Sequence, residues 1–188
     1  GTFGQHADPE VTMLETDLSF LGKEKYLFGA LASDGRIYCS PRMADKVLCI
    51  DPSTQTAYTV GSDLSYVEPN SFNAGAVVAP SGVIYCFMSK DCGVLRIIPP
   101  DQRRHKRTSL IQKDFKVDKT GANWWFGGAL AQDGKIYYTP GGANHVLRVD
   151  PETESMTLLD QDLGEFGSNG KWMTCAMAAN ECIYAVPC

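Results

Sequence analysis

The sequence has few of the residues on which catalytic and metal sites are usually built. It contains only three histidines: His6, His105 and His145. It has no Cys-x-x-Cys or His-x-x-x-His pair, so no spacing indicates a zinc site. It also lacks a Gly-x-Ser-x-Gly elbow and a phosphate-binding loop. The sequence therefore gives no positive reason to expect a catalytic centre, a bound metal or a cofactor.

Long hydrophobic runs, helical patterns and a basic surplus are also missing. No apolar run approaches the roughly 18 to 20 residues that a membrane-spanning helix needs, and no segment shows a convincing helical stripe. The formal net charge is −5, which argues against general nucleic-acid binding because that function needs a basic face. We therefore expect an all-β protein without a membrane span, and nucleic acid is an improbable partner.

The cysteines do not form a clean disulfide pattern. The chain has seven, an odd number, and no Asn-x-Ser/Thr glycosylation acceptor. Both features favour a reducing compartment, so the expected localisation is intracellular. Cys86 and Cys92 flank one loop and form a candidate pair, whereas small buried hydrophobic side chains account for most of the cysteines.

What the sequence does contain is a repeat. Four Ile-Tyr pairs are separated by 47, 52 and 47 residues: Ile37-Tyr38, Ile84-Tyr85, Ile136-Tyr137 and Ile183-Tyr184. A turn precedes each pair, and a small residue opens the apolar run before each turn: Gly29, Gly75, Gly128 and Cys175. We expect the Asp-Gly turns, such as Asp133-Gly134, to be two-residue turns with positive φ at both positions. The small residues are expected where inner strands approach closely.

The repeat unit is best explained as four short strands in about 47 residues, which is the signature of a β-propeller with four-stranded antiparallel blades. A β-sandwich would not explain why the sequence repeats at a fixed length, and the repeats of solenoid proteins are shorter or helical. In the third unit the expected strands are 128–131, 135–139, 146–149 and 156–159. The predicted units span 26–64, 72–115 and 125–163, with partial units at 8–25 and 172–188, all within one domain covering residues 1–188.

Two arrangements of these units remain open. In a closed four-blade ring, Val11 to Leu14 would supply a fourth strand to the last unit. Alternatively, the units belong to a larger propeller, which we favour because residues 1 to 7 make a poor third strand. An open blade would leave unpaired backbone groups, so we expect the isolated chain to self-associate or to need a partner.

A candidate binding surface follows from residues in the connections between units. Aromatic side chains enter the inner strands at equivalent places, with Asn, Lys and Arg nearby. Such a ring could hold a ligand or peptide, although a repeated aromatic also packs between neighbouring blades as core. The candidate binding residues are Lys25, Tyr26, Arg42, Asn70, Phe72, Asn73, Asn123, Trp124, Trp125, Asn144, Lys171 and Trp172.

One basic run interrupts the otherwise acidic chain. Its cations are Arg103, Arg104, Lys106 and Arg107, in a longer connection between two outer strands of the second unit. A solvated loop explains such a run. A contact for phosphate or for an acidic partner is the functional alternative.

The segment from Gly29 to Tyr38, GALASDGRIY, followed by Val47 to Pro52, VLCIDP, resembles blades of the NHL and gluconolactonase-like propellers. This resemblance is general to propellers. The segment is less similar to kelch repeats, and it lacks the Trp-Asp dipeptide of WD repeats. Similarity to the gluconolactonase-like enzymes implies a divalent metal in the central channel, held by Glu, Asn and Asp. Asn73 is the residue that this resemblance places near such a channel, and no matching Glu or Asp is found in the inner strands.

Three functions are compatible with these features. The first is a non-catalytic propeller that serves as a protein-interaction or scaffold module, with protein subunits or the rest of a longer chain as partners. The second is a gluconolactonase-like metal-dependent hydrolase. The third is a small-ligand or carbohydrate binder that uses the aromatic ring at the propeller face.

Overall fold

The computed structural model describes residues 11, 13–17, 19, 25–65, 72–88, 93–100, 108–112, 124–167 and 170–188; for 72–74, 88 and 112 it describes the backbone alone. Within these residues no helix has the length and apolarity needed to cross a bilayer. The strands are β1 (Tyr26–Leu31), β2 (Ile37–Pro41), β3 (Val47–Asp51), β4 (Thr56–Val60), β5 (Phe72–Val78), β6 (Ile84–Met88), β7 (Gly93–Ile97), β8 (Thr108–Gln112), β9 (Trp125–Leu130), β10 (Ile136–Pro140), β11 (Leu147–Asp150), β12 (Ser155–Leu158), β13 (Trp172–Met177) and β14 (Ile183–Pro187), with one 3₁₀ turn, η2 (Gly164–Phe166).

These strands form antiparallel sheets that are contiguous in sequence. Sheet 1 contains β1–β4, sheet 2 contains β5–β8, sheet 3 contains β9–β12, and the end sheet contains only β13 and β14. The Ile of each Ile-Tyr pair opens the second strand of its sheet. The prediction of an all-β fold with four-stranded antiparallel units is therefore confirmed for three sheets.

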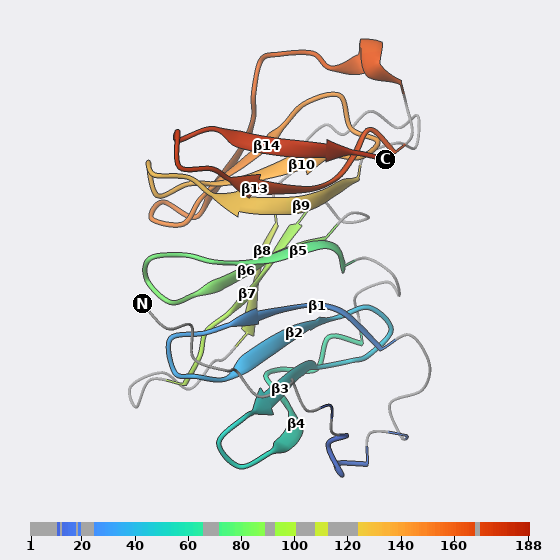
Figure 1. Ribbon diagram of the computed structural model, residues 1–188, viewed down its shortest axis with the longest axis vertical. Helices are drawn as coiled ribbons and strands as arrows, with labels where there is room; N and C mark the ends of the chain where they lie inside the picture. The colour runs from blue at the N-terminus through green and yellow to red at the C-terminus, as the bar shows by residue number, and fades with distance from the viewer. Residues whose placement is uncertain are drawn as a thin grey trace, which may run out of the picture.

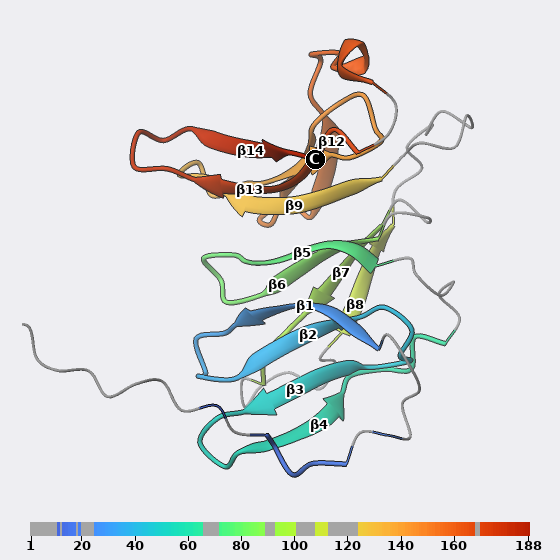
Figure 2. The same cartoon turned by 45° about the vertical axis from the view of Figure 1, so that its right-hand side comes forward.

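The sheets are arranged as an open series. Figures 1 and 2 show them stacked one above another, with sheet 1 and the end sheet at opposite ends. The first strands are neighbours in the order β1, β5, β9 and β13. The described sheets do not form the closed four-blade ring that was one of the two arrangements considered from the sequence.

The N-terminal segment differs from its expected role as an outer strand. Its described residues, 11 and 13–17, form no strand. Instead, the Ala57 backbone N–H in β4 donates to Thr16 Oγ1 at 3.1 Å. This contact satisfies a backbone donor of β4, the edge strand of sheet 1, which explains why the segment lies there rather than beside β14.

The Asp-Gly turns are longer than predicted. Gly134 N–H donates to Ala131 O (3.0 Å) and Ala131 N–H donates to Lys135 O (2.9 Å). Positive φ occurs at Gly134 (77°) but not at Asp133. The expected two-residue turn is therefore wrong, and the loop is a three-residue connection that ends in a left-handed residue. The same pair of hydrogen bonds recurs across Ala32–Arg36, Ala79–Val83 and Ala178–Cys182.

The recurring Tyr fixes this turn. An Asp or Asn of the turn stands four residues before the Tyr. One polar atom of its side chain forms a hydrogen bond with the Tyr hydroxyl, and the other accepts a hydrogen bond from a backbone N–H. The hydroxyl contact is 2.8 Å long in all three pairs: Tyr38–Asp34, Tyr137–Asp133 and Tyr184–Asn180. Side-chain capping therefore accounts for these polar residues, as expected for Asp and Asn in turns.

The end sheet carries a strained version of the same turn. Glu181 adopts φ of 65° where Gly35, Gly82 and Gly134 adopt 77° to 80°. A left-handed conformation costs an L-residue about 1–2 kcal/mol, whereas glycine adopts it readily.

Glu181→Gly is therefore expected to raise the free energy of unfolding by about 1 kcal/mol, because it relieves this cost. In a chain of this length that corresponds to about 2–4 °C in the thermal midpoint. Glu181→Ala is the control, since it removes the charge but keeps a Cβ. Equal gains from both variants in thermal denaturation would contradict the explanation.

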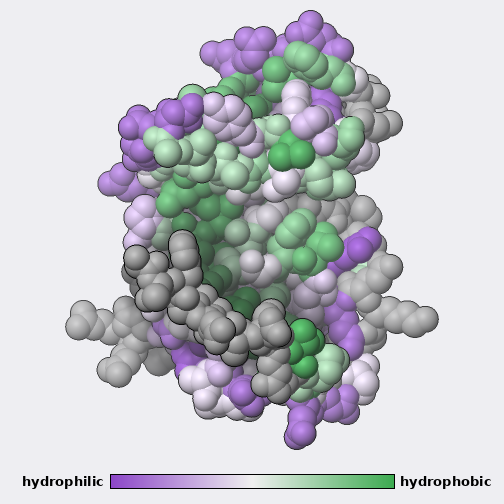
Figure 3. Space-filling view, viewed as in Figure 1, coloured by the Kyte–Doolittle hydropathy of each residue, from purple (hydrophilic) through white to green (hydrophobic). Residues whose placement is uncertain are grey.

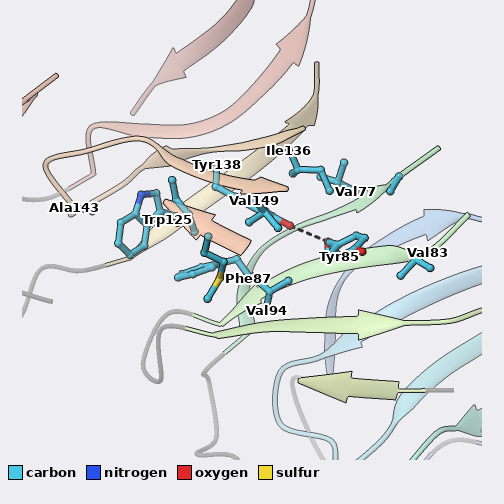
Figure 4. Close-up of a cluster of buried hydrophobic side chains, with 13 residues drawn as sticks. Val77, Val83, Tyr85, Phe87, Val94, Trp125, Ile136, Tyr138, Ala143 and Val149 are labelled. Carbon is cyan, nitrogen blue, oxygen red and sulfur yellow. Dashed lines mark hydrogen bonds between the residues drawn. The ribbon is translucent and has the colours of Figure 1, made fainter. Parts of the chain in front are cut away.

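Adjacent sheets share hydrophobic cores. Figure 4 shows the core between sheets 2 and 3, where Phe87 and Trp125 pack edge to face with ring centroids 5.0 Å apart. The buried Tyr138 hydroxyl donates to Tyr85 O at 2.9 Å, the dashed line in the figure. At the rim, Arg96 forms a 2.7 Å ion pair with Glu154. Sheet-to-sheet packing, rather than a shared backbone ladder, therefore holds the series together.

The register corrects one alignment made from the sequence. Gly128 pairs with Tyr138 across the hairpin, and its counterpart in sheet 2 is Ala76, which pairs with Cys86. A Cβ on Gly128 would lie 2.6 Å from the Tyr138 ring. An alanine fits at position 76 because Cys86, across the hairpin, is smaller than Tyr138. The residue equivalent to Gly128 is therefore Ala76, and the predicted equivalence of Gly75 with Gly128 is wrong by one residue.

The described cysteines are all free: Cys39, Cys49, Cys86, Cys175, Cys182 and Cys188. Cys86, one half of the candidate Cys86–Cys92 pair, is therefore a free thiol, and Cys92 lies outside the described residues. Burial raises the pKa of the Cys86 thiol to about 12, which keeps it protonated and unreactive at neutral pH.

Candidate functional site

The predicted aromatic positions are equivalent in the structure. Each opens the first strand of its sheet and pairs across the hairpin with the last residue of the second strand: Tyr26 with Pro41, Phe72 with Met88, Trp125 with Pro140, and Trp172 with Pro187. The connections that carry them therefore share one end of the sheets. The Asp-Gly turns lie at the other end.

Backbone hydrogen bonds join these connections to the loops after the second strands. Lys25 O accepts from Arg42 N–H at 2.7 Å, and Trp124 O accepts from Gly141 N–H at 3.0 Å. Lys171 O accepts from Cys188 N–H at 3.3 Å in the end sheet. The structure thus brings together several of the predicted residues, in one repeated arrangement per sheet.

Trp125 is part of the core. It is 2% exposed, and its indole N–H donates to His145 O at 2.8 Å. The alternative considered from the sequence, an aromatic packed between adjacent sheets, describes Trp125 correctly. Trp172 is half-buried and packs on Phe166 with centroids 5.6 Å apart. Trp125 therefore offers no ring face to a ligand.

Lys171 stabilises a junction between sheets. It is 5% exposed, and its ammonium donates to Gly142 O (3.2 Å) and Ala143 O (3.0 Å). Burial lowers the pKa of this ammonium, and Asp162 partly opposes the shift. Because its ammonium donates to two carbonyl groups in the loop between β10 and β11, Lys171 ties the end sheet to sheet 3.

Two polar atoms at this end have no partner. The Tyr26 hydroxyl and the Trp124 indole N–H are buried without a hydrogen bond. Burial raises the pKa of Tyr26 to about 12. Both side chains are half-buried, so the two atoms do not define a ligand site by themselves.

The remaining predicted residues are placed less completely. Asn144 is exposed, and its carbonyl accepts from Leu163 N–H at 2.7 Å. Arg42 is half-buried. For Phe72 and Asn73 the description covers the backbone in β5 alone. The others lie outside the described residues: Asn70, Asn123, Arg103, Arg104, Lys106 and Arg107.

The described residues bring no metal site together. Among them, no group of three or more His, Cys, Asp or Glu side chains could hold an ion. His145 Nδ1 lies 2.9 Å from Leu159 O and 3.1 Å from Gln161 O, so it must donate to carbonyl groups. His6 and His105 fall in the part of the chain that is not described.

Two clefts occur at the opposite end of the sheets, among the Asp-Gly turns. The larger, of about 300 Å³, lies between sheets 2 and 3 and is lined by Pro80, Ser81, Asp133, Gly134, Lys135, Asp150, Pro151 and Glu152. The smaller, of about 210 Å³, lies between sheets 1 and 2. Sequence reasoning missed both because their linings combine turns from two sheets. No local motif marks them.

The charges in the larger cleft are already paired. Lys135 Nζ donates to Asp150 Oδ2 at 2.8 Å, and this hydrogen bond holds the pKa of Asp150 at about 2. The other Asp150 oxygen accepts from Glu152 N–H at 2.9 Å. Arg36 and Asp51 form the equivalent ion pair in sheet 1, also at 2.8 Å. These groups stabilise the turns that line the cleft.

A further surface emerges when corresponding residues of the sheets are compared. We call the side of a sheet that packs on the following sheet its forward face, and the other side its rear face. Tyr38 shares a core with the rear-face residues Ile84 and Cys86, and Tyr85 shares a core with Ile136 and Tyr138. The recurring Tyr therefore lies on the forward face.

In the end sheet, this forward face is open. Tyr38 and Tyr85 are each 1% exposed, whereas their counterpart Tyr184 is 57% exposed. Val186 lies on the same side of β14 and is 52% exposed, whereas its counterparts Ser40 and Phe87 are fully buried. Sequence reasoning missed these residues, and no local motif marks them.

Hydrophobic residues also line the side of the molecule seen in Figure 3, in a hollow over the middle of the series where β5 and β6 lie. The exposed end-sheet residues and this hollow are two apolar surfaces that could contact another molecule.

Comparisons with known proteins identify the architecture. No protein-family model and no curated protein sequence matches the chain. Virginiamycin B lyase from Staphylococcus aureus matches with a TM-score of 0.60 and 18% identity, over 85% of this chain and 47% of the lyase. The extracellular domain of a hybrid two component system from B. thetaiotaomicron gives a TM-score of 0.61 at 14% identity, over 85% of this chain and 19% of that one.

A third structure, Kuenenia stuttgartiensis hydrazine synthase, gives a TM-score of 0.59 and 15% identity, covering 99% of this chain and 46% of that one. The chain thus spans about half the length of the lyase it matches. At these identities the likeness shows the fold alone. The lyase and the extracellular domain are propeller-type proteins, and together with the sheet topology they show that this chain has a propeller-type β fold.

Proposed function

We propose that this chain is a non-catalytic propeller segment that acts as a protein-interaction module in a larger protein or assembly. The observation that carries the proposal is the exposed forward face of the end sheet. The side chains equivalent to Tyr184 and Val186 are buried in sheets 1 and 2; in sheet 3, Thr139 is buried and Tyr137 is half-buried. An apolar sheet face of this kind is most simply used as a contact surface.

The placement of the polar residues supports the same proposal. The Asp and Asn side chains of the turns are bonded to Tyr hydroxyls and backbone N–H groups. Lys135 and Lys171 are similarly committed to Asp150 and to backbone carbonyls. Residues used in this way hold the fold together.

The hydrolase and the carbohydrate binder gain no specific support from the described residues. A channel metal needs converging oxygen ligands, and these residues contain no such group. A sugar platform needs an exposed aromatic face, which Trp125 does not present. We therefore put forward the interaction module alone.

The test removes the apolar character of the end face. We expect the unmodified chain to associate in sedimentation velocity runs at micromolar concentrations. The double variant Tyr184→Lys with Val186→Lys should sediment as a monomer. Its thermal midpoint should fall only slightly, because both side chains face solvent and the loss is that of the exposed contact between the Tyr184 hydroxyl and Asn180.

A matched control places the same two lysines on other exposed hydrophobic residues. Val11→Lys with Met13→Lys alters side chains that are 91% and 89% exposed and lie away from the end sheet. This control should associate as the unmodified chain does. A chain that stays monomeric at every concentration, or a control that dissociates equally, would refute the end face as a contact surface.

A further inference from the structure

The cleft between sheets 2 and 3 combines apolar walls with negative charge. Two prolines, Pro80 and Pro151, contribute apolar surface. The charged residues of the lining are three acids and one base: Asp133, Asp150, Glu152 and Lys135. The lining therefore carries a net charge of −2, which favours a cation as its occupant.

Two of these carboxylates keep their charge for a ligand. Lys135 and Asp150 neutralise each other through the 2.8 Å hydrogen bond from Nζ to Oδ2. Asp133 accepts from the Lys135 backbone N–H at 3.0 Å and from the Tyr137 hydroxyl at 2.8 Å, and both of these donors are neutral. Glu152 is exposed, and its backbone N–H is the group that donates to Asp150. A bound cation would therefore meet the carboxylates of Asp133 and Glu152.

The shape of the cleft suits one long side chain. Its volume of about 300 Å³ lies at the lower limit of small-molecule pockets. The Tyr85 hydroxyl donates to Pro151 O at 3.3 Å, so the β11–β12 turn is held against sheet 2. Arg and Lys side chains pack an aliphatic stem on apolar surface and keep the charged head at its rim. Such a side chain matches both the prolines and the carboxylates of this cleft.

The equivalent cleft between sheets 1 and 2 shows that sheet packing does not require these charges. All four charged positions of the larger cleft correspond there to uncharged residues: Ser81, Val83, Ile98 and Pro100. Asp34, on the opposite wall of the smaller cleft, forms an ion pair with Arg36. The acids that face a cation are therefore particular to the cleft between sheets 2 and 3.

The two clefts adjoin, because Ser81 lines both of them. A ligand whose cationic group enters the larger cleft can continue across Ser81 over the smaller one. Pro99 and Pro100 give the smaller cleft an uncharged wall for the neighbouring part of that ligand. This continuity favours a peptide segment over an isolated cation.

We propose that the cleft between sheets 2 and 3 binds an arginine or lysine side chain from an extended segment of a partner protein, and that the backbone of this segment crosses Ser81 along the smaller cleft. The proposal adds a second contact surface to the interaction module, formed by residues other than Tyr184 and Val186.

The test is a nuclear magnetic resonance titration of the ¹⁵N-labelled chain with the peptide acetyl-Ala-Ala-Arg-Ala-Ala-amide. The amide signals of Ser81, Gly134 and Glu152 should shift on binding. The same peptide with citrulline in place of arginine has nearly the same shape but no charge, and it should bind about tenfold more weakly. Acetyl-arginine-amide should also bind more weakly than the peptide, because it cannot reach across Ser81.

Matched variants locate the binding. Glu152→Gln should weaken binding of the arginine peptide about fivefold, because it removes one exposed carboxylate and keeps the backbone N–H that donates to Asp150. Glu165→Gln makes the same change of charge at an exposed residue of η2, outside the cleft, and should leave the affinity unchanged. Ser81→Trp, at an exposed position shared by both clefts, should abolish binding.

The outcomes separate this proposal from the end-face contact. Equal binding of the arginine and citrulline peptides, equal losses in Glu152→Gln and Glu165→Gln, or no binding at all would overturn the basic-peptide site and leave the end-face contact standing. The double variant Tyr184→Lys with Val186→Lys should bind the arginine peptide as the unmodified chain does. Binding that persists in a chain that never associates would support the cleft and overturn the end face.

Discussion

Gly128→Val is expected to lower the free energy of unfolding by about 3 kcal/mol or more, because the inner strand has no room for a branched side chain. A Cβ at this position would lie 2.6 Å from the Tyr138 ring and 2.9 Å from Val77, on opposite sides of the boundary between sheets 2 and 3. Tyr138 cannot move away easily, since its buried hydroxyl is bonded to Tyr85 O. The thermal midpoint should fall by roughly 6–12 °C.

Gly75 provides the control for this experiment. A Cβ there would meet Gly128 N at 3.5 Å, an ordinary van der Waals distance. Gly75→Ala should therefore change the thermal midpoint by no more than a degree or two, although it lies in the equivalent strand of sheet 2 and next to the site of Gly128→Val. Equal losses in the two variants would show that the pairing of Gly128 with Tyr138 is wrong.

Trp125→Ala is expected to cost about 4 kcal/mol, the range found for truncating a buried aromatic side chain. The change leaves a cavity beside Phe87 and deprives His145 O of its donor. Chemical denaturation with intrinsic fluorescence and circular dichroism would measure the loss. If Trp125 served a ligand at the surface instead, stability would be nearly unchanged and binding alone would suffer.

Trp172→Ala supplies the comparison, because Trp172 occupies the equivalent position in the end sheet. It is half-buried and packs on Phe166, so its truncation should cost clearly less than that of Trp125. Similar losses at both positions would contradict the division into a core residue and a rim residue.

The sheets could be predicted because their determinants are local. The Asp-Gly turn, the Tyr hydroxyl bonded to the turn and the Asp-Pro stop all act within about fifteen residues of one another. In the third unit the predicted runs 135–139 and 146–149 match β10 and β11 to within one residue. Local turn chemistry and alternating hydrophobicity were sufficient for these elements.

Features that depend on neighbouring sheets could not be predicted in the same way. The burial of Lys171 depends on two carbonyl groups in the preceding sheet, and a lone lysine before a strand gives no sign of them. Val11 to Leu14 resembled an outer strand, yet its neighbour Thr16 lies against β4, because a similar pattern does not decide which edge a segment meets. The role of the candidate binding residues in recognition remains a prediction.

The contiguity of the sheets has a consequence for cooperativity. Each sheet is built from one stretch of chain and contacts its sequence neighbours, so the free energy of folding approximates a sum of single-sheet contributions and nearest-neighbour couplings. Sheet 2 has two couplings, whereas the two-stranded end sheet has one. Local opening should therefore begin at the end sheet and reach sheet 2 last, so that the surface proposed for association is also the least protected part of the series.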